Sequence, residues 1–137
     1  MSLKIATILL LAAITSCQSI SINDIEKKIV TASRPGQSLT FQYSLTMTIK
    51  EDVMLKSIMY KNASKPINFS ISRLPDGLVM SNSEMLQSGI YYITAIAAFD
   101  ESIKSSNDTL LFNFENSSNK TFTFQKETVW KGNLLTK

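Results

Sequence analysis

Few residues of this chain have side chains suited to covalent or metal chemistry. Cys17 is the only cysteine among 137 residues, and histidine is absent. An internal disulfide, a Ser–His or Cys–His nucleophile pair, and the histidine or multiple-cysteine sets that hold most transition metals are therefore excluded. We expect neither a metal nor another cofactor.

Adjacent carboxylates are the remaining candidates for acid–base catalysis. Glu51 and Asp52 form one pair, and Asp100 and Glu101 form another. Neighbouring side chains on a strand or loop diverge, whereas acid–base catalysis needs both groups at one substrate. We interpret these charges as solubilising groups in turns, and we predict that the protein is not an enzyme.

The residues before Cys17 give a reason for a cysteine at that position. Lys4 precedes ten residues, 5–14, that are apolar except for Thr7. A membrane-spanning helix needs about 20 such residues, whereas the apolar part of an export signal has about 7 to 15. We therefore predict a cleaved signal peptide at residues 1–16.

Residues 14–17, Ile-Thr-Ser-Cys, resemble the lipobox of bacterial lipoproteins. A thiolate is a strong nucleophile and can take a diacylglyceryl group as a stable thioether. Several acyl chains then hold a protein on a membrane far more firmly than one chain does. We predict lipidation at Cys17, and Gln18 in place of Asp is typical of lipoproteins sent to the outer membrane. Ordinary signal-peptidase cleavage is the alternative.

The charge balance argues against a nucleic-acid partner. The formal net charge is +3 at pH 7, and it falls to about +2 without Lys4 of the predicted signal. Apart from Lys27 and Lys28 the basic residues do not cluster, so no stripe could follow a phosphate backbone. The roughly 120 residues from Cys17 onward suffice for one small domain.

A polar segment separates the predicted signal from the predicted domain. Residues 18–37 are mostly polar and end in Arg-Pro-Gly at 34–36, and Pro with Gly marks a turn or linker boundary. Isoleucines at positions 22, 25 and 29 have helical spacing, so a short amphipathic helix is an alternative. We favour a lipidated N-terminus and tether at 17–37, followed by one domain at 38–137.

Alternating apolar and polar residues predict strands over most of that domain. In residues 39–49 every odd position is apolar and every even one polar, which is typical of a strand with one buried face. Residues 66–74 repeat the pattern, and Pro75 with Gly77 predicts a turn. Further strands are predicted at 53–60, at 89–99, at 109–114 with 121–125 as a hairpin, and at an edge from 129 to 135. About six to eight short strands predict an all-β domain, a small antiparallel β-sandwich.

Residues 89–99 differ from the other predicted strands. Both alternate sets of side chains are apolar, and Thr94 is the only polar residue. Such a run predicts a strand that is covered on both faces, and a buried helix is the alternative.

A loop and a tryptophan are the candidates for contact with a partner. The loop around residues 78–88 is more apolar than a solvated connection needs, and Trp130 lies among charged residues near the end of the chain. A partly exposed tryptophan can anchor a partner, although it can also simply cap the end of a sandwich. The predicted partner-binding residues are Leu78, Met80, Met85, Leu86 and Trp130.

Two segments, taken with the lipobox cysteine, resemble a known family. The first is the strand at 66–74, with Pro66, Ile67, Phe69, Ile71 and Leu74, and the second ends in Tyr92, Ala97, Ala98, Phe99 and Asp100. They look like the outer-membrane lipoprotein of the type VI secretion system, the TssJ family. The resemblance covers roughly residues 55–105 and the export signal.

The chain departs from the family between these segments, where members typically carry a longer insertion and only residues 75–88 are present. This shortness is similar to the divergent lipoprotein of the intracellular-growth-locus type VI system. The resemblance implies a transthyretin-like sandwich, lipid-anchored at the periplasmic face of the outer membrane. It also implies that the domain binds the periplasmic domain of an inner-membrane secretion subunit.

Two other functions stay open at this level. One is a generic periplasmic lipoprotein that binds a small ligand or inhibits a hydrolase. The other is a secreted eukaryotic glycoprotein, which Asn-x-Ser/Thr triplets would suit. These triplets begin at Asn62, Asn68, Asn107, Asn116 and Asn119.

Overall fold

The structure, a computed structural model, describes residues 19–31, 38–63 and 65–135, and it describes side chains up to residue 131. Its strands are β1 (Ile20–Ile22), β2 (Ile25–Thr31), β3 (Thr40–Ile49), β4 (Val53–Tyr60), β5 (Pro66–Leu74), β6 (Leu78–Met80), β7 (Gly89–Ala98), β8 (Thr109–Asn116) and β9 (Thr121–Leu135). A short 3₁₀ turn, η2, spans Glu101–Ile103. The predicted all-β class is confirmed. Within the described ranges, no helix has the length and apolar composition to cross a membrane.

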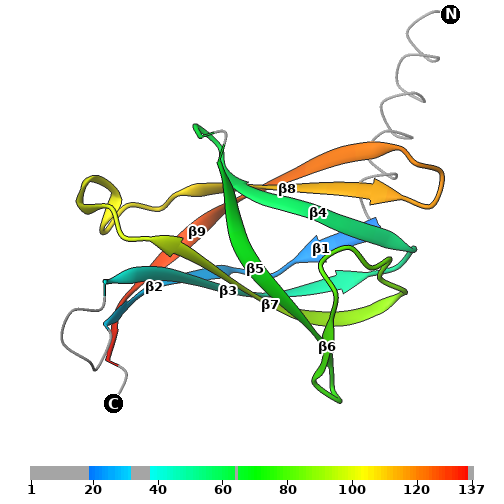
Figure 1. Ribbon diagram of the computed structural model, residues 1–137, viewed down its shortest axis with the longest axis horizontal. Helices are drawn as coiled ribbons and strands as arrows, with labels where there is room; N and C mark the ends of the chain where they lie inside the picture. The colour runs from blue at the N-terminus through cyan, green and yellow to red at the C-terminus, as the bar shows by residue number, and fades with distance from the viewer. Residues whose placement is uncertain (1–18, 32–37, 64, 136–137) are drawn as a thin grey trace, which may run out of the picture.

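The strands close into a barrel of seven, in the order β3, β2, β9, β8, β4, β5, β7 and back to β3. All of these pairs are antiparallel except β2 with β9. Figure 1 shows β4 and β8 lying over β2, β3 and β7. The sequence predicted two separate sheets. The hydrogen bonds instead form one closed sheet, because β9 and β5 each pair with strands of both layers.

Alternation along the strands decides which side chains fill the barrel. In β3 every second residue is buried, so Phe41, Tyr43 and Met47 point inward between half-buried threonine, glutamine and serine side chains. On the opposite layer, Phe112 and Phe114 of β8 are fully buried. Each large apolar side chain removed from water contributes about 1.5–3 kcal/mol, so this interior is the main source of stability.

The predicted tether is wrong for residues 19–31, which form β1 and β2. Ile20, Ile22, Ile25 and Ile29 are buried, and both strands pair with β3. Within each strand every second residue points inward, and the inward set of β2 includes the charged Lys27, which obscured this pattern in the sequence. The domain therefore includes residues from Ser19 onward rather than beginning at 38. Residues 32–37 lie outside the described part of the chain.

The prediction that residues 89–99 are covered on both faces is also wrong. Tyr91, Ile93 and Ala95 of β7 are buried, whereas Ile90 and Ile96 on the other face are 46% and 49% exposed. Since β7 lies between β3 and β5 in a barrel wall, only one of its faces can meet the core.

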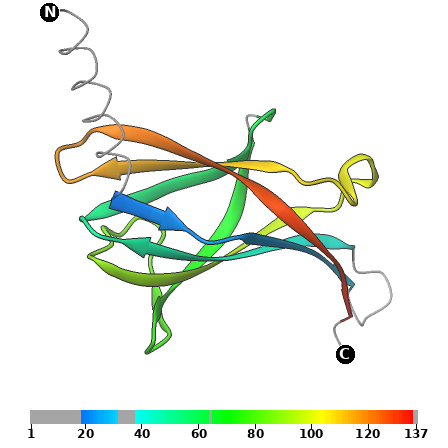
Figure 2. The same cartoon turned by 180° about the vertical axis from the view of Figure 1, so that it is seen from behind.

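The final strand is longer than predicted. Residues 129–135, expected as a separate edge strand, continue β9 without a break. The first half of β9 pairs with β8, and the second half pairs with β2 in parallel, which closes the barrel. Figure 2 shows β9 passing from β8 to β2 along the back of the molecule.

The barrel has two ends, which we name by residues that lie there. At the Ile20 end, Ile20 pairs with Ile49, and Val53 pairs with Asn116, so the β3–β4 and β8–β9 turns lie together. At the Lys27 end lie the loop that contains η2, the β4–β5 turn and the end of β9 (Figure 1).

Candidate functional site

The outward side chains of β3, β5, β6 and β7 form a surface that we call the uncharged face. Directly paired residues present their side chains on the same side of a sheet, so the register defines its members. They are Thr40, Gln42, Ser44, Thr46 and Thr48 of β3, Ile90, Tyr92, Thr94, Ile96 and Ala98 of β7, Asn68, Ser70, Ser72 and Leu74 of β5, and Val79 of β6. Within these four strands no outward side chain carries a charge.

Apolar side chains are concentrated at one part of the uncharged face. Val79 is 73% exposed, and it lies in one row with Ser72 and Tyr92. Leu74 and Ile90 form the next row and are 39% and 46% exposed. A surface that lacks charged residues and exposes aromatic and aliphatic side chains is typical of the centre of a protein–protein interface.

The β5–β6 hairpin extends one edge of this face. It projects from the barrel wall at the bottom of Figure 1 and ends in a turn at residues 75–77. Arg73 donates hydrogen bonds to both carboxylate oxygens of Asp76, at 2.6 and 3.4 Å, and this bonding lowers the pKa of Asp76. Gly77 adopts φ of 71°, a left-handed conformation that favours glycine.

The predicted partner-binding residues lie in three different places. Leu78 is exposed on the hairpin, and Met80 and Met85 are half-buried near it. Leu86 is fully buried, because its backbone pairs with Val53 of β4 and its side chain enters the core. Trp130 lies on β9, so the structure does not bring it together with the other four.

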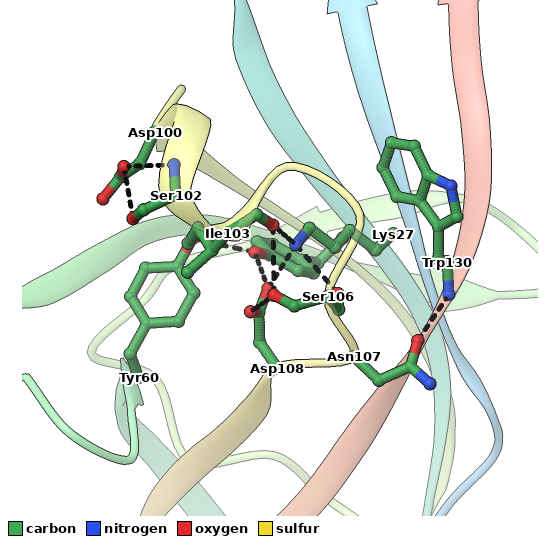
Figure 3. A network of polar contacts seen from close by, with 10 residues as sticks. Lys27, Tyr60, Asp100, Ser102, Ile103, Ser106, Asn107, Asp108 and Trp130 are labelled. Carbon is green, nitrogen blue, oxygen red and sulfur yellow. Dashed lines mark hydrogen bonds and ion pairs between the residues drawn. The ribbon is translucent and has the colours of Figure 1, made fainter.

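A buried ion pair organises the Lys27 end. Lys27 pairs with Tyr43, so its side chain enters the barrel, where it is fully buried. Its ammonium lies 2.7 Å from Asp108 Oδ2 and donates to the backbone carbonyls of Ile103 and Ser106. Figure 3 shows Lys27 reaching from its strand to the loop that carries these acceptors.

Aromatic rings complete the surroundings of the ammonium group. The ring centroids of Phe41 and Trp130 lie 4.5 and 5.8 Å from Lys27 Nζ, within the range of cation–π attraction. The backbone N–H of Trp130 donates to Asn107 Oδ1 at 3.2 Å. An ion pair, carbonyl acceptors and ring faces together compensate the cost of burying this charge.

Two phenols extend the network from Asp108 to the surface. Tyr43 donates to Asp108 Oδ2 at 2.8 Å, and its oxygen lies 2.8 Å from that of Tyr60. Because the proton of Tyr43 is directed to the carboxylate, the stronger acceptor, Tyr60 donates to Tyr43. Burial raises the pKa of both phenols above the ordinary value, so both remain protonated at neutral pH.

An open hollow of about 520 Å³ lies beside this network. Tyr60, Asp100, Asn107 and Asp108 are among the residues that line it. The carboxylate of Asp100 accepts hydrogen bonds from the hydroxyl and the backbone N–H of Ser102, and these bonds lower its pKa.

The network joins three segments of the chain. Asp108 is bonded to Lys27, Tyr43 and Ser106, and Tyr43 is bonded to Tyr60. Among the described residues, no group of three or more carboxylate, cysteine or histidine side chains could hold a metal ion. Lys27 was not identified from the sequence as an inward-facing residue, although it lies midway between two inward-facing isoleucines of β2.

Cys17 lies outside the described residues. No protein-family model matches the sequence, and no curated protein matches it significantly.

Proposed function

We propose that this protein is a non-enzymatic assembly lipoprotein of a type VI secretion system. In this proposal Cys17 carries the lipid anchor at the periplasmic face of the outer membrane. The uncharged face binds the periplasmic part of an inner-membrane subunit and so links the two membranes.

The composition of the uncharged face is the observation that carries the proposal. A monomeric protein rarely exposes a large contiguous apolar patch, and here Leu74, Ile90, Val79 and Tyr92 are exposed in two adjacent rows. The neighbouring outward residues are hydroxyl and amide side chains, which lose little on desolvation if the partner supplies hydrogen bonds. Protein partners commonly bind at such surfaces.

The two segments behind the family resemblance are adjacent in space. Residues 66–74 form β5, residues 89–98 form β7, and seven residue pairs join them, from Asn68 with Ile96 to Leu74 with Ile90. They build the centre of the uncharged face. We propose that the two layers of the barrel correspond to the transthyretin-like fold implied by the resemblance, with β5 and β9 joining them into one closed sheet rather than two separate ones.

The anchor is tested with a Cys17→Ser variant. Without a thiol no diacylglyceryl thioether can form, so we expect the protein to leave the outer-membrane fraction and secretion to fail. Membrane fractionation and an assay of secreted substrate measure the two effects. Unchanged membrane retention and secretion would overturn the lipoprotein assignment.

The binding face is tested with Val79→Asp. A carboxylate at the most exposed apolar position would have to be desolvated in the interface, so co-purification of the inner-membrane subunit from detergent-solubilised envelopes should be lost. Val129→Asp is the matched control, because Val129 is a 37% exposed strand valine on β9, outside the uncharged face. Equal loss with both variants would contradict the proposal.

The hollow at the Lys27 end favours a second candidate function, the binding of a small polar ligand. Tyr60 donates its proton to Tyr43, so its oxygen offers only lone pairs to the hollow, beside the carboxylate of Asp100. A ligand with an amine would suit these acceptors. Calorimetric titration with small amines tests this function, and Tyr60→Phe should abolish any heat of specific binding.

A further inference from the structure

We propose that the Ile20 end of the barrel rests directly against the bilayer surface, with the lipid headgroups as its contact. The inference builds on the proposed lipidation of Cys17. It adds the orientation of the domain, which lipidation alone does not determine.

The covalent reach between lipid and barrel is short. Three peptide links join Cys17 to Ile20, and each advances the chain by at most about 3.8 Å, so the two Cα atoms are within about 11 Å. The tether expected from sequence would have held the domain farther away. Since residues 19–31 belong to the barrel wall, almost none of that length is free.

The first described residues are fixed to the barrel and cannot act as a hinge. Ile20 is 5% exposed and pairs with Ile49, and the Lys50 N–H donates to the Ser19 carbonyl at 2.9 Å. On the other side, Lys126 Nζ donates to the Ile22 carbonyl at 2.8 Å. Peeling β1 from the wall would expose two isoleucines, so the attachment point is rigid.

The surface around this point is suited to lipid headgroups. The β3–β4 and β8–β9 turns flank Ile20, and they contribute two exposed lysines, Lys50 and Lys120, and two exposed carboxylates, Glu51 and Asp52. Charges of both signs suit zwitterionic headgroups, which carry a phosphate and an ammonium group. Phe122 lies near the start of β9 at this end of the barrel, is 37% exposed, and stacks on Phe114. An exposed aromatic ring at a polar end of a domain is typical of residues at a membrane–water interface.

This orientation determines where the hollow at the Lys27 end and the uncharged face lie relative to the bilayer. The ten residues of β3 span about 30 Å, and strands of a barrel are tilted by about 35–45°, so the Lys27 end and its hollow stand roughly 20–25 Å from the bilayer. The strands of the uncharged face then run away from the membrane, with the face exposed laterally to a partner in the periplasm.

Tryptophan fluorescence tests the orientation, because the chain has one cysteine and one tryptophan. The chain from Cys17 onward, which contains every described residue, is coupled through Cys17 to maleimide-headgroup lipid in phosphatidylcholine vesicles. A spin label on the phosphatidylcholine headgroup quenches nearby indoles. In a Trp130→Phe background, Ser117→Trp reports on the β8–β9 turn and Asn62→Trp on the β4–β5 turn; both positions are exposed.

We expect loss of fluorescence for Ser117→Trp and none for Asn62→Trp, or for the native Trp130. The same proteins left uncoupled, mixed with the same vesicles, are the baseline. Equal quenching at the two turns, or stronger quenching of Asn62→Trp, would overturn the orientation, as would no quenching of either variant.

Chemical coupling supplies the anchor whether or not cells acylate Cys17. Mass spectrometry of the mature protein from its native host tests acylation separately. A bare Cys17 with the expected quenching pattern would remove the lipoprotein function while leaving the geometry intact. Acylation with the opposite pattern would remove only the orientation.

Discussion

Two outward surfaces of one barrel differ sharply in charge. The uncharged face of β3, β5, β6 and β7 has no ionised outward side chain, whereas the outward residues of β4, β8 and β9, which we call the charged face, include Lys56, Glu115, Glu127 and Lys131. Lys56 and Glu115 form an ion pair at 3.3 Å.

The same period-two alternation builds both faces, and both enclose the same core. Folding requires only that inward residues be apolar, so it leaves the outward composition free. Charged residues are the usual choice there, because they keep a sheet surface soluble. The outward side chains of three long strands of the uncharged face lack charge, and folding does not require this. We attribute this composition to the binding of a partner.

The largest predicted effect is on folding stability, and it compares the removal of a lysine inside the barrel with the removal of a lysine on the charged face. Lys27→Met leaves Asp108 without its buried counter-ion, and we expect it to lower the free energy of unfolding by about 3 kcal/mol or more. Lys56→Met breaks a half-exposed pair and should cost less than about 1 kcal/mol. Urea denaturation measures both, and similar losses would show that the Lys27 network does not stabilise the fold.

A smaller effect is expected on partner affinity, which should fall after a substitution on the uncharged face and not after one on the charged face. Tyr92→Asp places a charge at the centre of the uncharged face, and we expect it to weaken binding of the inner-membrane subunit by about 2 kcal/mol, roughly 30-fold. Gln125→Asp on the charged face should leave affinity unchanged. Surface plasmon resonance measures the affinities, and thermal unfolding checks that both variants fold. A loss confined to Gln125→Asp would reverse the assignment of the faces.

The smallest effect concerns pH and the interior phenols. The pKa values of Tyr43 and Tyr60 are raised by burial, so above the ordinary phenol pKa of about 10 the unfolded chain loses protons that the folded barrel keeps. Stability should therefore be intact below pH 10 and fall above it. Tyr43→Phe should cost about 1 kcal/mol at neutral pH and make the alkaline decline shallower. Chemical denaturation at pH 8 and at pH 10.5 compares the slopes; an unchanged slope would contradict this origin.

Much of the fold follows from local pattern. The strands at 53–60 and 66–74 have the predicted bounds, because alternation and a following turn are both local signals. Residues 20–31 were missed because Glu26, Lys27 and Lys28 interrupt their hydrophobic pattern. The parallel pairing of β2 with β9 joins residues about a hundred positions apart, and no local signal specifies it.

The candidate site was less predictable for two physical reasons. A strand with apolar residues on both faces has the same sequence pattern whether its second face is buried in the core or exposed to a partner. The sequence of β7 therefore predicts burial of both faces. A lysine inside a barrel violates the pattern used to find inward residues, and only the loop at 103–108 shows what satisfies it.

Site-specific photo-crosslinking in cells shows whether the uncharged face is the partner-binding surface. Benzoylphenylalanine in place of Val79 or Tyr92 is compared with the same residue in place of Gln125 or Val129. We expect adducts with the inner-membrane secretion subunit from the first two positions alone. Adducts with that subunit from Gln125 or Val129 only, or from none of the four, would contradict this expectation.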